Sequence, residues 1–195
     1  SEESADGRLK VSMFSTPAEI LNAPIDSAEG GHGTHTTATA AGSWRGNPYY
    51  GMAPDAELVL TGTGAYSYDD EIIYGMRAAG EYARQNGKRA VLSLSLGTGI
   101  GPRDGTSAVG LVSRELRNQG DFICFAAGND GKRSATIFRD FASDTTAVRS
   151  IFCKWYNGPT HLCPLEAWSA DTTSAELQIL VVQHDTVRYA SRWIT

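Results

Sequence analysis

The 195-residue sequence lacks the features that mark several classes of protein. No apolar run approaches the roughly 20 residues that a membrane-spanning helix requires, so we expect no membrane span. The net charge is -5 and no basic cluster occurs, which argues against a nucleic-acid partner. The N-terminus, Ser-Glu-Glu-Ser-Ala-Asp-Gly, has neither the basic nor the apolar region of a signal peptide. The hydrophobic fraction of 41% and the charged fraction of 20% are those of an ordinary folded domain.

Cysteine is also scarce, because three cysteines are too few for a disulfide scaffold. Cys124 lies within the apolar run Phe122-Ile123-Cys124-Phe125, where we expect a buried packing residue. Cys153 and Cys163 flank a predicted turn at Asn157-Gly158-Pro159. A hairpin there could join the two cysteines in a disulfide, and a pair of free thiols is the simpler expectation.

Up to about Gly131 the sequence alternates between strand and helix signals. Apolar runs predict strands at 57–60, 90–96 and 122–127, and residues at helical spacing predict helices over 69–86 and 107–119. Gly87 and Gly120 are the expected helix stops. Strands separated by helices of this length require crossover connections. The pattern therefore predicts an α/β fold, with a parallel sheet and helices on both of its faces.

After Gly131 the sequence becomes rich in β-forming residues and loses its helical pattern. The candidate strands, separated by turn residues, are 151–156, 165–168, 176–183 and 186–193. We therefore divide the chain into residues 1–135 and a β-rich module over 136–195. The sequence stops inside an apolar strand, and an unfinished sheet would expose an unpaired edge strand that is prone to aggregation. We expect the chain to be a segment of a longer polypeptide.

Residues 30–43 are the most informative stretch, reading Gly-Gly-His-Gly-Thr-His-Thr-Thr-Ala-Thr-Ala-Ala-Gly-Ser. Glycines on both sides of His32 free the backbone and remove bulk around its imidazole. The small residues that follow have helical character and would let neighbouring elements approach closely. We predict a helix that presents His32 in its first turn. His32 and His35 could instead ligate a metal, but no acidic or cysteine partner stands at zinc-motif spacing, so we expect no metal there.

This stretch closely resembles the histidine motif of the subtilisin family of serine peptidases, the subtilases. The resemblance continues in the family's order through Gly51-Met52-Ala53-Pro54-Asp55-Ala56, Ser95-Leu96-Gly97 and Ala126-Ala127-Gly128-Asn129-Asp130-Gly131. It implies a subtilisin-like parallel sheet.

The resemblance also assigns roles to individual residues. His32 would be the general base, and His35 a structural residue buried in the helix. Ser95, Leu96 and Gly97 would hold the substrate backbone by main-chain hydrogen bonds. Asn129, at the end of an apolar strand, would stabilise the oxyanion that forms when a peptide carbonyl is attacked. Standing alone, Asn129-Asp130-Gly131 would be only a turn after a strand.

Two members of the family's catalytic triad are not identifiable, because its chain order is Asp, then His, then Ser. Before His32 only Asp6 and Asp26 occur, and neither follows a convincing strand. Gly105-Thr106-Ser107-Ala108 mimics the serine motif, yet it precedes Asn129, whereas the family's serine follows the asparagine. We expect Ser107 to be a decoy that caps the following helix. The catalytic aspartate and serine would then lie outside this chain, and the isolated chain would be inactive.

One branch of the family, which includes germination proteases of clostridia and related Bacteroidetes enzymes, is similar in two respects. It shares the pattern of residues 101–106, and it inserts a β-sandwich after the oxyanion asparagine. Residues 1–135 would then be the central part of the peptidase domain, and 136–195 part of the insertion. The implied partners are a polypeptide substrate and the remainder of the same protein, in a secreted or cell-envelope location.

No cofactor is expected. Many relatives bind calcium, but no dense carboxylate loop points to a calcium site here. The competing hypothesis for function is a catalytically inactive pseudoprotease that binds peptides or regulates another protein.

Overall fold

The structure is a computed structural model that describes residues 2–3, 10–23, 31–44, 46–63, 68–98, 101–129, 131–132, 137–140, 148, 166–168 and 176–194. The chain divides into two compact units, Ser1–Thr136 and Ile137–Thr195. The elements of the first unit are β1 (Glu2–Glu3), β2 (Lys10–Val11), α1 (Pro17–Asn22), α2 (His32–Ala41), α3 (Asp69–Gln85), β3 (Val91–Leu94), α4 (Ala108–Asn118) and β4 (Phe122–Phe125). The second unit contains β5 (Leu180–Gln183) and β6 (Thr186–Ala190).

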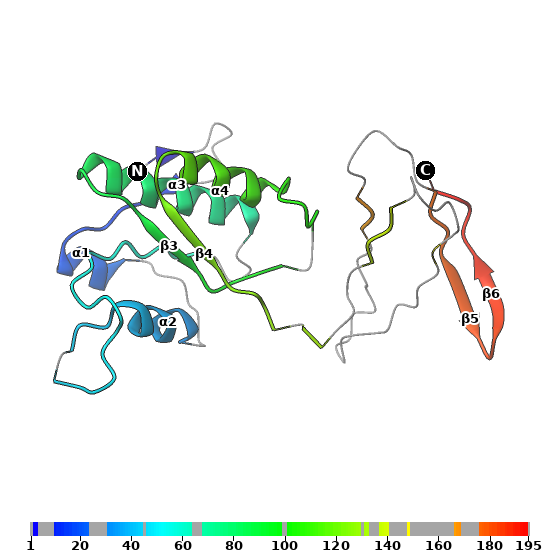
Figure 1. Ribbon diagram of the computed structural model, residues 1–195, viewed down its shortest axis with the longest axis horizontal. Coiled ribbons are helices and arrows are strands. Elements are labelled where there is room, and N and C mark those ends of the chain that lie inside the picture. The colour runs from blue at the N-terminus through cyan, green and yellow to red at the C-terminus, as the bar shows by residue number, and fades with distance from the viewer. Residues whose placement is uncertain are drawn as a thin grey trace. The chain divides into compact units, whose positions relative to one another are not determined.

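The core of the first unit lies where α3 and α4 pack on β3 and β4 (Figure 1). The strands are parallel, in register from Val91 opposite Phe122 to Leu94 opposite Phe125. Buried side chains come in pairs from three elements: Ile72 and Met76 from α3, Leu92 and Leu94 from β3, and Val112 and Leu116 from α4. The predicted α/β fold with a parallel sheet is confirmed. So are the helices expected over 69–86 and 107–119 and the strands expected over 90–96 and 122–127, each slightly shorter than predicted.

In the part of the chain that the structure describes, the sheet of β3 and β4 has one buried face and one exposed face. Leu92 and Leu94 point into the core, whereas Val91 is 71% exposed and its register partner Phe122 is 64% exposed. Successive strand residues face opposite sides, which explains one wrong prediction. Cys124 is exposed, because it pairs in register with Ser93 on the side away from Leu92 and Leu94.

Two further predicted strands are absent from the described residues. Residues 57–60 form no strand, and neither do residues 166–168. An apolar run becomes a strand only where a neighbouring strand satisfies its backbone groups. In the described part of the chain, β3 and β4 pair only with each other. Segment 57–60 is instead tied to α3 and to the residues just after it. The Tyr82 hydroxyl of α3 donates to the Glu57 carboxylate at 2.9 Å, and Lys88, which follows the helix, forms an ion pair with the same carboxylate.

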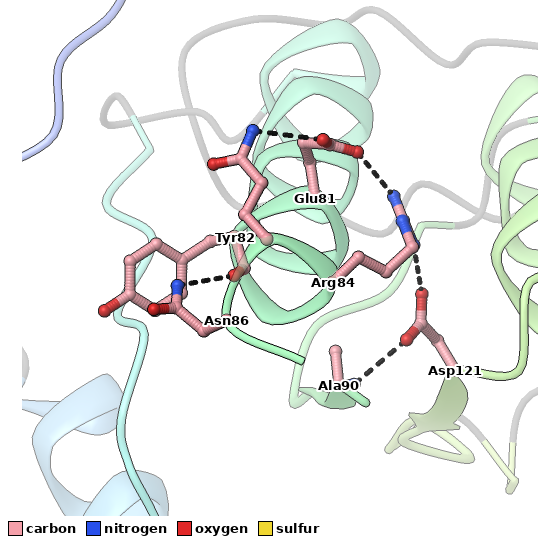
Figure 2. Close-up of polar contacts among 7 residues, drawn as sticks. Glu81, Tyr82, Arg84, Asn86, Ala90 and Asp121 are labelled. Carbon is pink, nitrogen blue, oxygen red and sulfur yellow. Dashed lines mark hydrogen bonds and ion pairs between the residues drawn. The ribbon is translucent and has the colours of Figure 1, made fainter. Parts of the chain in front are cut away.

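A buried carboxylate joins the start of β4 to α3 and β3 (Figure 2). The Asp121 side chain is 1% exposed. It accepts hydrogen bonds from Arg84 Nη1 at 2.8 Å and from the Ala90 backbone N–H at 2.9 Å. Arg84 also contacts Glu81 at 3.2 Å on the surface of α3. The contact holds three elements together at the end of the sheet opposite to where β3 and β4 finish.

The short helix α1 was not predicted, although its signal is present in the sequence. Thr16 Oγ1 accepts from the Glu19 backbone N–H at 3.2 Å, and the Glu19 carboxylate accepts from the Thr16 backbone N–H at 2.9 Å. This reciprocal pair is a capping box, and Pro17 follows the cap at the first helical position. The Thr16 and Ser15 backbone N–H groups hold the pKa of Glu19 below its usual value.

The second unit contains an antiparallel hairpin formed by β5 and β6. Its turn consists of His184 and Asp185, both with positive φ, at 47° and 56°. These angles match the tight hairpin turn whose twist follows that of the strands. Beyond the hairpin, Leu177 and Ile194 exchange backbone hydrogen bonds of 2.9 Å in an isolated bridge.

Candidate active site

The ends of β3 and β4 bring two of the predicted site segments to the same edge of the sheet. The Ala126 backbone N–H donates to the Leu94 carbonyl at 3.1 Å, extending the parallel pairing past the last strand residues. Ser95, Leu96 and Gly97 follow β3 directly, and Asn129 follows β4 by a few residues. Because the strands are parallel and in register, both segments leave the sheet at its carboxyl edge, where ligands of α/β folds bind. All four residues are exposed.

The backbone at Gly128 turns the chain before the candidate oxyanion residue. Gly128 has φ of 83°, a conformation that favours glycine, and an added Cβ there would meet nothing within 4 Å. The Asn129 side chain makes no hydrogen bond to another described residue, and its amide N–H groups are therefore available as donors. An unengaged amide beside an exposed backbone edge can donate a hydrogen bond to a developing oxyanion.

His32 is the first residue of α2, as predicted from the glycines around it. The residue before it, Gly31, is left-handed with φ of 60° and supplies no side-chain cap. The helix begins with the backbone hydrogen bond from His35 N–H to the Gly31 carbonyl at 3.0 Å. The His32 side chain is exposed, and no hydrogen bond joins its imidazole to any other residue that the structure describes. An imidazole in this setting is accessible for proton transfer.

The small residues of α2 permit a close backbone approach at its C-terminal end. Gly51 N–H donates to the Gly42 carbonyl at 2.8 Å, and Ala53 N–H donates to the Ala40 carbonyl at 2.9 Å. A Cβ added at Gly51 would come within 2.3 Å of the Gly42 nitrogen and 2.6 Å of the Ala41 nitrogen. The Gly-Met-Ala-Pro segment therefore packs directly against the C-terminal end of α2, and position 51 requires glycine because a side chain there would overlap the helix backbone.

The prediction that His35 is buried in the helix is wrong. His35 is exposed, and among the described residues of α2 only Ala41 is buried. The contacts of the helix with the 51–53 segment run along its last turns, so they leave the first turns, which hold both histidines, uncovered.

Ser107 caps the following helix, as expected. It is the N-cap residue of α4, and its hydroxyl oxygen accepts from the Gly110 backbone N–H at 3.1 Å. The preceding turn is held by Asp104, whose carboxylate accepts from the Thr106 backbone N–H at 2.9 Å and from its hydroxyl at 2.6 Å. The hydrogen bonds from the Thr106 side chain and backbone lower the pKa of Asp104.

The structure thus groups Ser95, Leu96, Gly97 and Asn129 at one sheet edge, but no hydrogen bond within its described part links His32 to them. Asp6, Asp26, Cys153 and Cys163, which the sequence analysis weighed, lie outside the described residues. No group of three metal-ligating side chains occurs among the described residues. Of their helices, none is long and apolar enough to cross a membrane.

Sequence reasoning missed Asp121, which positions the starts of both strands. Its signal was a lone acidic residue between Gly120, a helix stop, and an apolar strand. A carboxylate at this position can accept hydrogen bonds from a neighbouring strand and helix. The sequence alone does not identify the partners, which the structure shows to be Arg84 and the Ala90 N–H.

Comparison with known proteins identifies what this chain resembles. The sequence model of the "Subtilase family" matches residues 4–151. A subtilisin from Bacillus sp. (strain TA39) is 36% identical over 133 residues, which cover 66% of this chain and 31% of that protein. Subtilisin-like protease 1 from Arthroderma gypseum is 36% identical over 153 residues, covering 72% of this chain and 29% of the fungal protein. Subtilisin-like protease 1 from Trichophyton rubrum is 36% identical over 107 residues, covering 52% of this chain and 19% of that protein.

The chain spans about a third or less of the length of the curated relatives that it matches. No solved structure matches it at a significant level.

Proposed function

The chain belongs to the subtilase family, and from this we propose that it forms the central part of a serine endopeptidase whose substrates are polypeptides. The observation that carries the proposal is the common sheet edge reached by Ser95, Leu96, Gly97 and Asn129. In this proposal the backbone of Ser95–Gly97 aligns an extended substrate, as an added strand would. The scissile carbonyl then lies beside the amide of Asn129.

His32 would act as the general base in this reaction. It takes the proton of an attacking serine hydroxyl, and the serine oxygen bonds to the substrate carbonyl carbon. The carbonyl oxygen becomes an oxyanion that Asn129 stabilises. The protonated imidazole then returns the proton to the leaving amine as the peptide bond breaks. The exposed imidazole of His32 and the free amide of Asn129 are the groups that these steps require.

The nucleophile and the acidic partner of His32 would come from polypeptide outside these residues. No Gly-Thr-Ser motif follows Asn129 in the sequence, and no aspartate that ends a strand is recognisable before His32. The β-rich residues 136–195 would be part of a module inserted between the oxyanion asparagine and the serine. The isolated chain would then hydrolyse peptides little or not at all.

The test is labelling of the full-length protein with a fluorophosphonate, which reacts only with an activated serine. We expect strong labelling that His32→Ala abolishes. Asn129→Ala should lower turnover of a chromogenic peptide about 10²–10³-fold, a value measured on subtilisin itself. Labelling and turnover that survive His32→Ala unchanged would falsify the proposed role of the histidine.

Ser107 provides a second test, because its hydroxyl can be removed without removing the cap. Aspartate caps helices as well as serine does, so Ser107→Asp should keep α4 stable while deleting the hydroxyl. Fluorophosphonate labelling of the full-length protein should persist in this variant. Its loss, in a protein with unchanged thermal stability, would make Ser107 the nucleophile.

A second candidate is a pseudoprotease that binds or regulates without cleaving. It becomes the better hypothesis if the full-length protein has no Gly-Thr-Ser motif after Asn129. Absence of fluorophosphonate labelling in the full-length protein, together with retained binding of an extended peptide, would support it. We also propose a secreted or cell-envelope location, which cell fractionation of the source organism would test.

A further inference from the structure

A depression of about 630 Å³ lies between α4 and β4 in the first unit. The Phe122 and Ala126 N–H groups donate to carbonyls of segment 90–94, at 2.9 and 3.1 Å, on the β3 side of β4. Backbone groups alternate in direction along a strand, so those of Ile123 and Phe125, which line the depression, point away from β3. Since the described residues offer β4 no strand partner other than β3, one side of the depression is an unpaired strand edge.

Arginine side chains form the other side of the depression. Arg114 and Arg117, one turn apart on α4, lie on the face of the helix that lines it. The core face of α4 is a different one, which carries Val112 and Leu116. Both arginines are exposed, and neither makes a hydrogen bond or ion pair with another residue that the structure describes. Arg89 adds a third guanidinium to the lining.

The carboxylates that line the depression are already engaged. Asp104 accepts from the Thr106 N–H and hydroxyl, and the buried Asp121 accepts from Arg84. The arginines of α4 therefore have no negative partner within the described residues, although the whole chain carries a net charge of -5.

The two sides of the depression together fit an extended acidic peptide. An unpaired strand edge binds a further strand through its N–H and C=O groups. Arginine binds carboxylates through two parallel N–H bonds. A small anion would use the arginines but leave the strand edge unpaired, and a second copy of this edge would bring like charges together. A strand that carries Asp or Glu toward α4 satisfies both sides.

We infer that an extended acidic segment of the same polypeptide, from outside these 195 residues, lies in the depression as a further strand on β4. Its backbone pairs with Ile123 and Phe125, and its carboxylates face Arg114 and Arg117. The source is the same polypeptide because the chain spans about a third or less of the relatives that it matches, and because an unpaired edge is prone to aggregation. The inference rests on the proposal that the chain is the central part of a longer protein.

The first test is hydrogen exchange, resolved by residue, in the full-length protein. The Ile123 and Phe125 amides should exchange as slowly as those of Phe122 and Ala126, which β3 already protects. Fast exchange at Ile123 and Phe125 beside slow exchange at Phe122 and Ala126 overturns the inference. This measurement needs no substitution and so does not depend on the folding of a variant.

Charge variants test the acidic character of the added strand. Arg114→Glu and Arg117→Glu should each speed exchange at Ile123 and Phe125 about tenfold or more, because repulsion between carboxylates replaces a charge-assisted hydrogen bond. Arg103→Glu is the matched control and should leave exchange unchanged. Arg103 is also exposed and without a hydrogen bond or ion pair among the described residues, but it does not line the depression. Equal effects of the three variants overturn the inference.

A zero-length cross-link identifies the occupant of the depression. In the full-length Arg114→Lys variant, a carbodiimide joins the lysine amine to a carboxylate in direct contact. We expect a cross-link within one molecule, to Asp or Glu outside residues 1–195, that the Arg103→Lys variant does not form. Cross-links only to residues 1–195, or to a second protein molecule, overturn the inference.

Fluorophosphonate labelling of the same samples separates this inference from the peptidase proposal. Absent labelling together with slow exchange at Ile123 and Phe125 refutes only the peptidase and supports the added strand. Strong labelling together with fast exchange at the two amides overturns only the added strand.

Discussion

Removal of the Asp121 carboxylate should destabilise the α/β unit far more than removal of a matched surface carboxylate. Two ion pairs join α3 to the α4–β4 region at the same distance of 2.8 Å, Arg84 with Asp121 and Arg77 with Glu115. They differ in burial. The Asp121 side chain is 1% exposed, whereas the Arg77 and Glu115 side chains are 51% and 43% exposed. The comparison therefore isolates the effect of burial on an ion pair.

The expected magnitudes follow from this difference. Breaking a buried ion pair by removing one partner costs about 3–5 kcal/mol, because the other charge is left uncompensated. Arg84 is 31% exposed, so water partly screens the charge that remains and the lower end of that range applies. Asp121→Ala also removes the acceptor of the Ala90 N–H, and we expect a loss of about 3 kcal/mol. Asp121→Asn keeps an acceptor and should cost about 1–2 kcal/mol. Glu115→Ala should cost less than about 1 kcal/mol.

The assay is urea unfolding followed by far-ultraviolet circular dichroism, with the free energy of unfolding compared among the variants. A double-mutant cycle should give a coupling energy of about 2 kcal/mol between Arg84 and Asp121. The cycle between Arg77 and Glu115 should give about 0.5 kcal/mol. If Asp121→Ala and Glu115→Ala lower the free energy of unfolding equally, the argument from burial is refuted.

Three further predictions concern contacts elsewhere in the chain. Gly51→Ala should lower the free energy of unfolding by about 1–3 kcal/mol, because its Cβ would overlap the backbone at the end of α2. The Lys88 ammonium lowers the pKa of Glu57, and the Glu57 carboxylate raises that of Lys88. The stabilisation that this ion pair gives the folded protein is therefore complete between the ordinary pKa values of 4.5 and 10.5. It is lost as the pH falls through the lowered pKa of Glu57 or rises through the raised pKa of Lys88. Lys88→Met removes the pair and should flatten a plot of Tm against pH. Replacing His184 and Asp185 by Asn-Gly should stabilise the β5–β6 hairpin by about 1 kcal/mol, measured as slower amide hydrogen exchange, because glycine adopts positive φ without strain.

The helices and strands of the core could be predicted because their signals are local. The apolar residues of α3 and α4 recur at helical spacing, and Gly87 and Gly120 end both helices with positive φ. The prediction of a strand at 57–60 was wrong, because an apolar run does not specify a pairing partner. The prediction that Cys124 is buried was wrong for a related reason. Apolar residues fill both faces of a parallel strand, so composition alone does not tell which face meets the helices.

The candidate site was predictable in part for the same reasons. A motif that directly follows a strand must lie at the sheet's carboxyl edge, and this placed Ser95–Gly97 and Asn129 correctly relative to β3 and β4. The position of His32 within the first turn of α2 was also a local prediction and is confirmed. The exposure of His35 was not predictable, because it depends on which elements cover the helix.

The decoy serine shows why chain topology alone does not identify a nucleophile. In a β–α–β unit the helix starts where the first strand ends, so α4 necessarily begins at the same sheet edge as Gly97 and Asn129. A Gly-Thr-Ser sequence at that start therefore lies near the candidate site whether or not it has a catalytic role. The hydrogen bonds of the hydroxyl are better evidence for or against a catalytic role than its position is. Ser107 Oγ accepts from the Gly110 N–H, which stabilises the helix, and within the described residues no hydrogen bond joins this hydroxyl to a base of the kind that a nucleophile needs. In the proposed peptidase, the serine that completes the site would instead place its hydroxyl against the imidazole of His32.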